Sequence, residues 1–399
     1  MPIKNITGAD HYVLQAAISA YSDEAFTNAR KLSGTDLVGS NPDIDTNTET
    51  YVGTVRWHKP VDAVINIGSI SDDTDGTFTS DDTTFLTYIK TVRTAGKQKV
   101  NLQKVITQVD GLAKFGRDFG EYRAQDEHDA LLATLKGVGM SELMNGSATG
   151  SGATGLGGQT FDNDPTDQKY GFYVDLGGKL ITAPTTSSQG AQRAEGFLQA
   201  LGMAWKDYEP EYCYLVVTPE ILASLRSANL VDQTTVTSGN ITFNSIFQGK
   251  FRLIQTRSNQ SLSTAQHALF KTTGGDGAGV PLADVSTKTS YLVLPGSLAF
   301  EQLEVPESTE IERSARSYKG TGTTQIWHRW GYVIAPKGYD WTGSQDAFPS
   351  NAGYGEVTED SGTTYENIED VTTIANARHV FNRKYTSALS LGILPVFHS

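Results

Sequence analysis

The feature that most constrains this chain is one long helical pattern, which runs from Leu112 to Leu143. Apolar residues recur along it at helical spacing, while acidic and basic residues occupy the opposite side. At 1.5 Å per residue, such a helix would be more than about 40 Å long. We therefore expect a spine along which the rest of the molecule is arranged. The apolar stripe consists of Phe115, Phe119, Tyr122, Leu131, Leu135 and Val138.

The segments before this helix predict a shorter helix and then strands. Residues Asp10–Leu32 have apolar residues at helical spacing, with Asp10 as the N-cap. Residues 51–70, 83–93 and 99–109 are rich in β-branched and aromatic residues, as is typical of strands. They hold too few large apolar residues for a core of their own. We therefore expect an extended hairpin that lies on another part of the molecule.

The segments after the long helix mix the two types of element. A helix is predicted over residues 191–205, and the run "YLVVTPEILASLRSANL" predicts a strand followed by a helix. In that helix Thr218 is the N-cap and Pro219 takes the first helical position. Further strand patterns follow without a regular β–α alternation, so we predict an α+β fold.

Composition and charge exclude several classes of protein. The net charge of −13 argues against a nucleic-acid-binding protein, whose affinity would depend on a basic face. No run approaches the ~18 apolar residues of a membrane span, and the first residues lack the apolar core of a signal peptide. The single cysteine, Cys213, lies in a strand-like run, which predicts a buried apolar residue and a chain without disulfides.

The charges are unevenly distributed along the chain. One segment holds seven basic residues and the single acid Asp110, whereas residues 338–377 hold eight acids and no base. These segments are either two solvated surfaces, or a basic segment of one copy that meets the acidic segment of another. The basic residues are Lys90, Arg93, Lys97, Lys99, Lys104, Lys114 and Arg117.

An aspartate-rich run, "SDDTDGTFTSDD", is a candidate calcium loop. Measured against the EF-hand pattern, Ser71 takes the first position and Asp82 the twelfth. A serine supplies no charge at the first position, and aspartate is shorter than the usual bidentate glutamate. We therefore predict no metal site here. We expect an exposed turn at the hairpin, whose aspartates Asp73, Asp75 and Asp82 keep the segment soluble.

No motif in the chain predicts catalysis or a cofactor. The glycines 150, 152 and 155 satisfy G-x-G-x-x-G, but a helix pattern precedes them where a dinucleotide site requires a strand. There is no G-x-S-x-G sequence, and His328 is predicted to be a strand histidine with its hydrogen bonds satisfied. The glutamates of residues 301–312 predict a charged rim or an interface. We predict no catalytic residue, no cofactor and no bound metal.

The order of these elements resembles a known family. The run "YLVVTPEILASLRSANL" is followed by "GKFRLIQTR", "SYLVLPGSLAFEQLE" and "HRWGYVIAPKGYDW". In the last of these, His328, Arg329, Gly331 and Pro336 match a recurrent pattern of the family. The chain is similar to the major capsid proteins of tailed bacteriophages, which have the Hong Kong 97-type fold. The specific similarity covers residues 211–341, and the order of elements extends it to the whole chain.

The resemblance implies how the chain is divided. Its parts would be an N-terminal arm, an extended β-hairpin (E-loop), a long spine helix, a peripheral domain and an axial domain. The implied boundaries are 1–50 for the arm, 51–111 for the hairpin, 112–206 and 326–399 for the peripheral domain with its spine helix 112–143, and 207–325 for the axial domain.

The resemblance also implies a function. The chain would be a structural protein without catalysis, which self-assembles as hexamers and pentamers into the icosahedral head shell of a virion. Assembly would take place in the host cytoplasm without a membrane, and the shell would enclose double-stranded DNA without sequence-specific binding. Scaffolding, portal and decoration proteins are its implied partner classes. The implied inter-subunit residues are Asp73, Asp75, Asp82, Lys90, Arg93, Lys97, Lys99, Lys104 and Arg117.

Two other classes of function stay open from the sequence. One is another self-assembling structural protein, such as a phage tail component or a surface-layer subunit. The other is a hydrolase or lyase whose scattered carboxylates act in a groove. Closed shells in the electron microscope would favour a capsid subunit, and monomers with a deep cleft would favour an enzyme.

Overall fold

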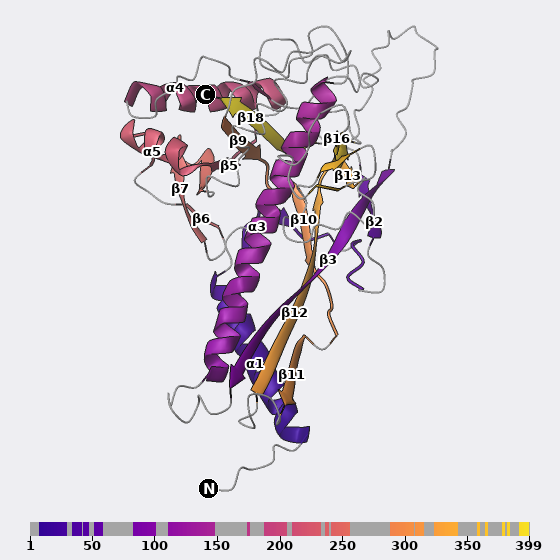
Figure 1. Cartoon of the computed structure of the whole chain (residues 1–399). Coiled ribbons are helices and arrows are strands. Elements are labelled where there is room, and N and C mark those ends of the chain that lie inside the picture. The colour runs from indigo at the N-terminus through magenta and orange to yellow at the C-terminus, as the bar shows by residue number, and fades with distance from the viewer. Residues whose placement is uncertain are drawn as a thin grey trace, which may run out of the picture.

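The computed structural model is a mixed helix and strand structure, which confirms the predicted α+β class. It places the long helix α3 between two sheets (Figure 1). The residues that the structure describes are 8–29, 34–41, 43–47, 52–58, 83–100, 111–147, 174–175, 187–205, 210–232, 236–238, 241–255, 288–306, 308–314, 323–341, 357–359, 364–365, 377–379, 381–383 and 391–398.

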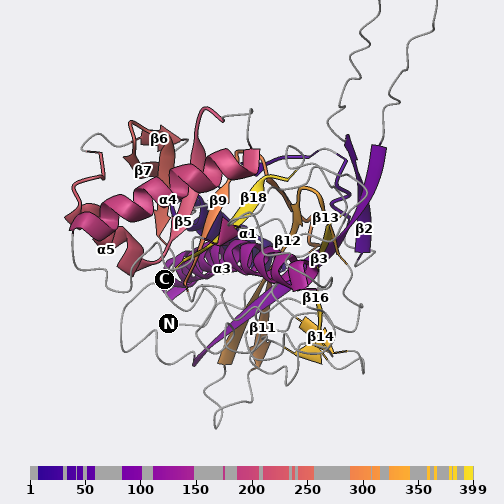
Figure 2. The ribbon, with the colours of Figure 1, turned by 90° about the horizontal axis from the view of Figure 1, so that it is seen from above.

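One sheet has seven strands in the order β4-β18-β9-β5-β8-β7-β6. The helices α4 (Ser187–Trp205) and α5 (Pro219–Ser227) lie beside it, and we call this unit the seven-stranded lobe (Figure 2). Its strands are β4 (Val174–Asp175), β5 (Cys213–Val217), β6 (Val236–Ser238), β7 (Ile241–Ile246), β8 (Phe251–Gln255), β9 (Lys288–Val293) and β18 (Ile393–His398).

The other sheet has six strands in the order β1-β10-β12-β3-β2, with β11 also paired to β12. Together with α1 (Gly8–Ala29) and α3 (Gly111–Ser147), it forms a narrow unit that we call the stem (Figure 1). Its strands are β1 (Val38–Gly39), β2 (Val52–His58), β3 (Thr83–Val100), β10 (Leu298–Gln302), β11 (Thr309–Ser314) and β12 (Thr323–Pro336).

Short strands complete the described structure. β13 pairs with β17, and β14 pairs with both β15 and β16. Sheet pairing crosses the predicted boundary between the axial and peripheral domains, because β18 joins the seven-stranded lobe and β10 joins the stem. Strand pairing alone does not test the domain division, which stays a prediction. The bounds are β13 (Tyr339–Trp341), β14 (Val357–Glu359), β15 (Thr364–Tyr365), β16 (Ala377–His379) and β17 (Phe381–Arg383).

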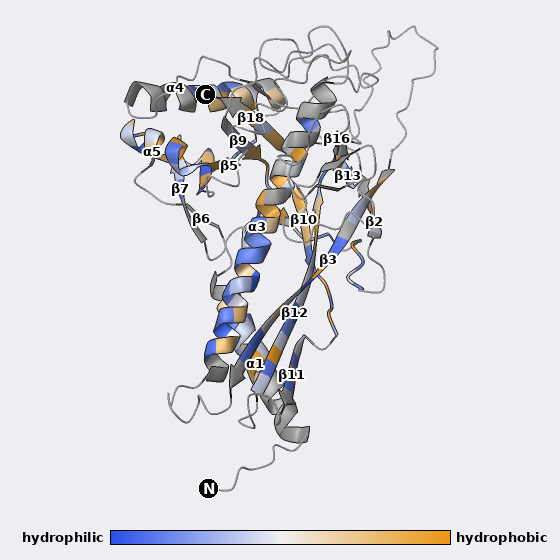
Figure 3. Cartoon of the chain, in the orientation of Figure 1, coloured by the Kyte–Doolittle hydropathy of each residue, from blue (hydrophilic) through white to orange (hydrophobic). Residues whose placement is uncertain are grey.

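The main apolar core lies where the two sheets meet α3. It combines Phe197 and Trp205 of α4, Leu135 of α3, and residues of both sheets. The indole of Trp205 donates a hydrogen bond to the carbonyl of Leu391 at 3.1 Å, so its one polar atom is satisfied within this core. Along α3, the hydrophobic colour concentrates in this region, and the half that lies in the stem is mostly hydrophilic (Figure 3).

The long helix matches its prediction closely but corrects one residue of the stripe. It spans Gly111–Ser147 against the predicted 112–143. Phe119, Leu131, Leu135 and Val138 are buried as expected, whereas Tyr122 is 55% exposed. Tyr122 therefore does not belong to the buried face. Its ring lies 5.0 Å from the ammonium group of Lys97, a contact that its spacing along the helix could not predict.

The predicted helix starts were right in one case and wrong in the other. Thr218 occupies the N-cap of α5 and Pro219 its first turn, as predicted, although the Thr218 side chain makes no capping hydrogen bond. Asp10 was predicted to be the N-cap of the first helix, but α1 begins at Gly8. Asp10 is therefore an interior residue of the first turn.

Strand β3 is longer than either strand predicted in this region. Residues 83–89 pair with β2, and residues 90–100 pair with β12. Because the pairing with β12 continues through residues 94–98, the strand has no break there. Two of its cross-strand pairs join an aromatic residue to a glycine. Tyr88 covers Gly53, and a Cβ at Gly96 would lie 2.5 Å from the ring of Trp327. These rings cover backbone that the glycines leave bare, and they hold the register of the three strands.

Candidate inter-subunit surface

The structure describes only part of the predicted inter-subunit set. Asp73, Asp75, Asp82 and Lys104 lie outside the described residues. Lys99 lies in β3, opposite Thr324, and its side chain is likewise outside the description. The four that can be placed with their side chains are Lys90, Arg93, Lys97 and Arg117.

Lys90 is buried inside its own chain. Its ammonium group donates hydrogen bonds to Asp45 Oδ2 at 2.8 Å and to the backbone carbonyl of Asn47 at 2.5 Å. The hydrogen bond from Lys90 lowers the pKa of the Asp45 carboxyl below its ordinary value. Next to this pair, the Tyr88 hydroxyl accepts a hydrogen bond from the Asp45 amide at 2.9 Å. Lys90 therefore fastens the segment around Asp45 to β3.

Arg93 points from β3 toward α3. Its Nε lies 3.8 Å from Asp126 Oδ1. The other oxygen of Asp126 accepts hydrogen bonds from the Trp330 indole at 3.0 Å and the Tyr332 hydroxyl at 2.9 Å. Asp126 therefore contacts both β3 and β12, and these contacts position α3 on the sheet.

Lys97 of β3 lies next to the start of α3. Its ammonium group forms an ion pair with Asp118 and lies 5.9 Å from the Phe115 ring centroid and 5.8 Å from that of Phe119. Together with Tyr122, three aromatic rings and one carboxylate surround it. Such a site stabilises the ammonium group at this position, because the faces of aromatic rings carry partial negative charge.

Within residues 90–117, the basic residues with described side chains therefore fall into two groups. Lys90, Arg93 and Lys97 each have an acidic partner within the same chain, so their charges serve the stem itself. Lys114 and Arg117 are exposed on the first turns of α3. The large apolar side chains Tyr21, Phe85, Val92, Tyr122 and Trp327 of the stem are also exposed.

His328 lies at the centre of the stem and confirms its prediction as a satisfied strand histidine. It is 2% exposed, with Nε2 3.2 Å from the Ser22 hydroxyl and Nδ1 3.0 Å from that of Thr309. Its ring stacks on Phe119 with a centroid separation of 5.4 Å. Burial, and secondarily the positive charge of Arg123, lowers the pKa of His328 to about 4. In its neutral form, this histidine of β12 contacts α1 through Ser22, α3 through Phe119 and β11 through Thr309.

The described part of the predicted arm packs against the rest of the same chain. In the described part, Ile18, Phe26, Leu37 and Ile44 are buried, and β1 pairs in parallel with β10. These residues of the arm therefore contribute to the packing of their own chain.

A signal for this packing is present in the sequence. Gly116 and Gly120 form a G-x-x-x-G pair on one face of α3. A Cβ at Gly116 would lie 2.9 Å from the carbonyl oxygen of Ile18, and one at Gly120 would lie 2.7 Å from the amide nitrogen of Phe26. Small residues at this spacing let two helix backbones approach closely, so the pair marks where α1 crosses α3.

The described residues hold no group of three or more His, Cys, Asp or Glu side chains that could bind a metal ion. Cys213 is buried, and burial raises the pKa of its thiol well above the ordinary range, which makes it unreactive. Among the described helices, none combines the length and the apolar character that crossing a membrane requires.

Comparisons with known proteins gave results at the level of structure alone. No family model and no curated protein matches the chain. It is similar to the capsid of cyanophage P-SCSP1u (8% identity, 75% of this chain and 84% of that one, TM-score 0.42) and to that of Ralstonia phage GP4 (10%, 78% and 86%, 0.41). It is also similar to the acid-stable capsid of Helicobacter pylori bacteriophage KHP30 (9%, 93% and 92%, 0.43). These structures are phage capsids. At TM-scores below 0.5, we base the function on the chain's own architecture.

Proposed function

We propose that this chain is a structural capsid subunit, which self-assembles into the icosahedral head shell of a tailed DNA bacteriophage. In this proposal α3 is the spine helix, β2 and β3 begin the extended hairpin, and the seven-stranded lobe is the core of the axial domain. The shell consists of hexamers and pentamers, encloses double-stranded DNA without reading its sequence, and performs no catalysis. Scaffolding, portal and decoration proteins are the partner classes of such a shell.

The build of the stem is the observation that supports this proposal most. A helix of 37 residues, about 55 Å long, runs beside strands of 18 and 14 residues. Yet at the end of the stem where α1, α3 and the start of β12 meet, the apolar cluster formed by the described residues has three buried members, Ile18, Phe119 and Ile326. At this end of the stem, the large side chains of Tyr21, Tyr122 and Trp327 are exposed. They gain burial by lying against neighbouring copies, which favours a repeated structural subunit.

Sedimentation of the purified chain tests this proposal. We expect a fast, narrow boundary from closed particles, together with a slow boundary from unassembled subunits. A single slow boundary under all salt and concentration conditions tested would contradict it.

The exposed basic pair of α3 allows a sharper test of how copies meet. If Lys114 and Arg117 bind an acidic surface of a neighbour, the double change to glutamate removes the fast boundary at low salt and leaves folding intact. For comparison, Lys97→Glu reverses a charge that is paired with Asp118 inside the subunit, so it is expected to lower the stability of the subunit itself. Normal particles from the double variant at low salt would rule out this contact.

A further inference from the structure

Residues 34–37, the described part of the connection between α1 and β1, lie at the junction of the two sheets. Leu37 is fully buried in the main core, and Val38 and Gly39 of β1 pair with Leu298 and Ala299 of β10. The backbone of Asp36 is therefore anchored to the stem. Its carbonyl accepts a further hydrogen bond from Gly296 at 2.8 Å, in the turn that leads from β9 to β10.

The side chain of Asp36 makes its contacts with the other sheet. Its two carboxylate oxygens accept hydrogen bonds from the hydroxyl groups of Tyr212 and Tyr214, one each. Nη1 of Arg252 lies 3.4 and 3.5 Å from the same two oxygens and donates to the Tyr214 hydroxyl at 3.2 Å. Tyr214 and Arg252 are neighbours across the β5–β8 pair of the seven-stranded lobe.

These four side chains form a compact unit. The Arg252 guanidinium lies 3.6 Å from the centroid of the Tyr212 ring, and the rings of Tyr212 and Tyr214 meet edge to face at 6.2 Å. The hydrogen bond to Asp36 adds to burial in raising the pKa of Tyr212 to about 12, so the Tyr212 hydroxyl keeps the proton that it donates in this contact.

The direction of these bonds distinguishes them from the apolar part of the junction. The main core spans both sheets, but apolar contact is non-directional and tolerates small rotations. Hydrogen bonds to a carboxylate weaken steeply when their angles change. The Asp36 cluster therefore restrains the angle between stem and lobe in a way that the apolar core does not.

We infer that Asp36, Tyr212, Tyr214 and Arg252 form a latch that fixes the orientation of the seven-stranded lobe relative to the stem. This inference goes beyond assembly itself and, for the shell, rests on the proposed function. Subunits of hexamers and pentamers meet their neighbours at different angles. A subunit with a loosened latch can accept more of these angles, and its shells would vary more in diameter.

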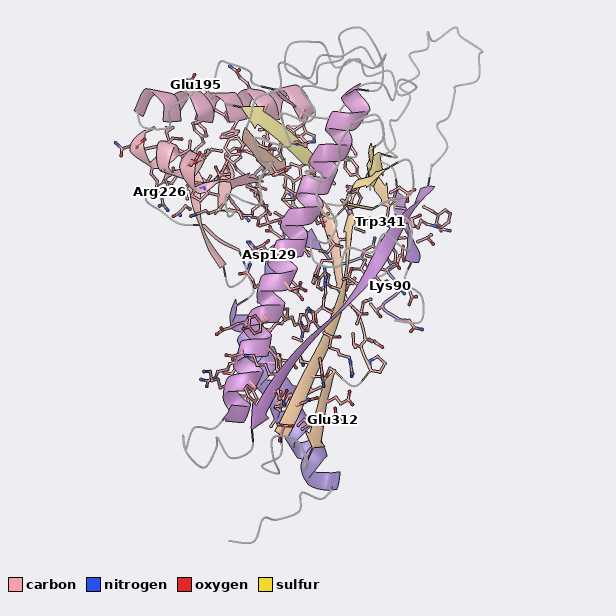
Figure 4. The ribbon with its side chains drawn as sticks, in the orientation of Figure 1. Lys90, Asp129, Glu195, Arg226, Glu312 and Trp341 are labelled. Atoms are coloured by element: carbon pink, nitrogen blue, oxygen red, sulfur yellow. The ribbon has the colours of Figure 1, made fainter. Side chains whose placement is uncertain are left out.

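The orientation can be measured between two spin labels by double electron–electron resonance. Glu195 of α4 and Glu312 of β11 are both exposed, lie in different units and are far apart in the molecule (Figure 4). Both would be changed to cysteine for labelling, because buried Cys213 does not compete for the label. The measurement uses the unassembled full chain, so it does not depend on shell formation.

We expect a narrow distance distribution for the labelled parent and a broadened or shifted one for Asp36→Ala. Because Asp36→Ala can also act through the backbone, Tyr212→Phe with Tyr214→Phe provides a second way to open the latch. The matched control is Ser40→Ala, which removes a hydrogen bond from the same arm to Glu301 within the stem. This control should keep the parent distribution, and all variants are checked for folding by circular dichroism.

Two results would overturn the inference. If the Asp36→Ala and double tyrosine variants both give the parent distribution, the four residues do not fix the lobe. If the distribution broadens but electron microscopy finds shells of unchanged diameter, the latch does not act on curvature. A parent chain that forms no shells would instead contradict the proposed function, and the label distances would still test the latch.

Discussion

At the scale of single residues, the stem is held by buried polar groups that join separate elements. Ser22, His328 and Thr309 bring together α1, β12 and β11, and Asp126 brings α3 to β12. Hydrogen bonds in such an environment are strong when complete and costly when one partner is lost. The stem therefore depends on the protonation states of a few side chains.

His328 predicts a specific loss of stability in acid. The folded chain favours the neutral imidazole, since the pKa is lowered from 6.5 to about 4. The stability that this histidine contributes is present above pH 6.5, falls as the pH drops, and is lost near pH 4. The full loss is about 3 kcal/mol.

Urea unfolding of the wild type and of His328→Gln from pH 7 to pH 4 would measure this loss. Glutamine keeps a donor and an acceptor but does not titrate in this range, so the difference between the two profiles isolates the histidine. Parallel profiles would show that His328 titrates normally.

Lys97 and Arg117 predict losses of stability of different size for the same charge reversal. Lys97→Glu places a carboxylate beside Asp118 and among three aromatic rings, which should lower the free energy of unfolding by about 1–2 kcal/mol. Arg117 lies on an exposed turn of α3, so Arg117→Glu should change the free energy of unfolding by less than about 0.5 kcal/mol. Thermal unfolding of the two subunits compares them directly, and equal losses would contradict the placement of Lys97.

At the scale of elements, the close crossing of α1 over α3 depends on two glycines. Gly120→Ala would normally favour a helix by up to about 1 kcal/mol. Here the added methyl group would meet Ala25 at 2.7 Å and push α1 away from α3. We therefore expect a net destabilisation of roughly 1–3 kcal/mol and faster proteolysis of α1.

Gly202 of α4 provides the matched control for this prediction. A methyl group added there would meet nothing within 4 Å, so Gly202→Ala should stabilise the chain by up to about 1 kcal/mol. Differential scanning calorimetry of the two variants would show opposite shifts in Tm. If Gly120→Ala also raised Tm, the close crossing would be wrong.

The sequence predicted elements best where one pattern dominates a segment. The periodicity of α3 and the Thr218–Pro219 start of α5 are local signals, and both were confirmed. The continuity of β3 through Gly96 could not be predicted, because it depends on pairing with β12 more than 200 residues away. The ion pairs of Lys90 and Lys97 were missed for the same reason, since their partners come from other elements.

At the scale of the whole molecule, the arm determines how the subunit is tied together. It packs on α3 through α1, joins the six-stranded sheet through β1, and reaches the seven-stranded lobe through Asp36. The sequence predicted the α+β class and an arm before the hairpin, but not that the arm is bound to its own subunit. If the proposed function is right, the exposed faces of α3 and of the β3–β12 strands are the surfaces at which we expect copies to meet.

The central claim is that copies of this chain build a closed shell, and cryo-electron microscopy of the purified, assembled protein tests it most directly. We expect hollow icosahedral particles in which each copy shows α3 beside the long β3 and β12 strands, with its exposed basic turns at a neighbouring copy. Discrete monomers, or open filaments without closed particles, would contradict the claim.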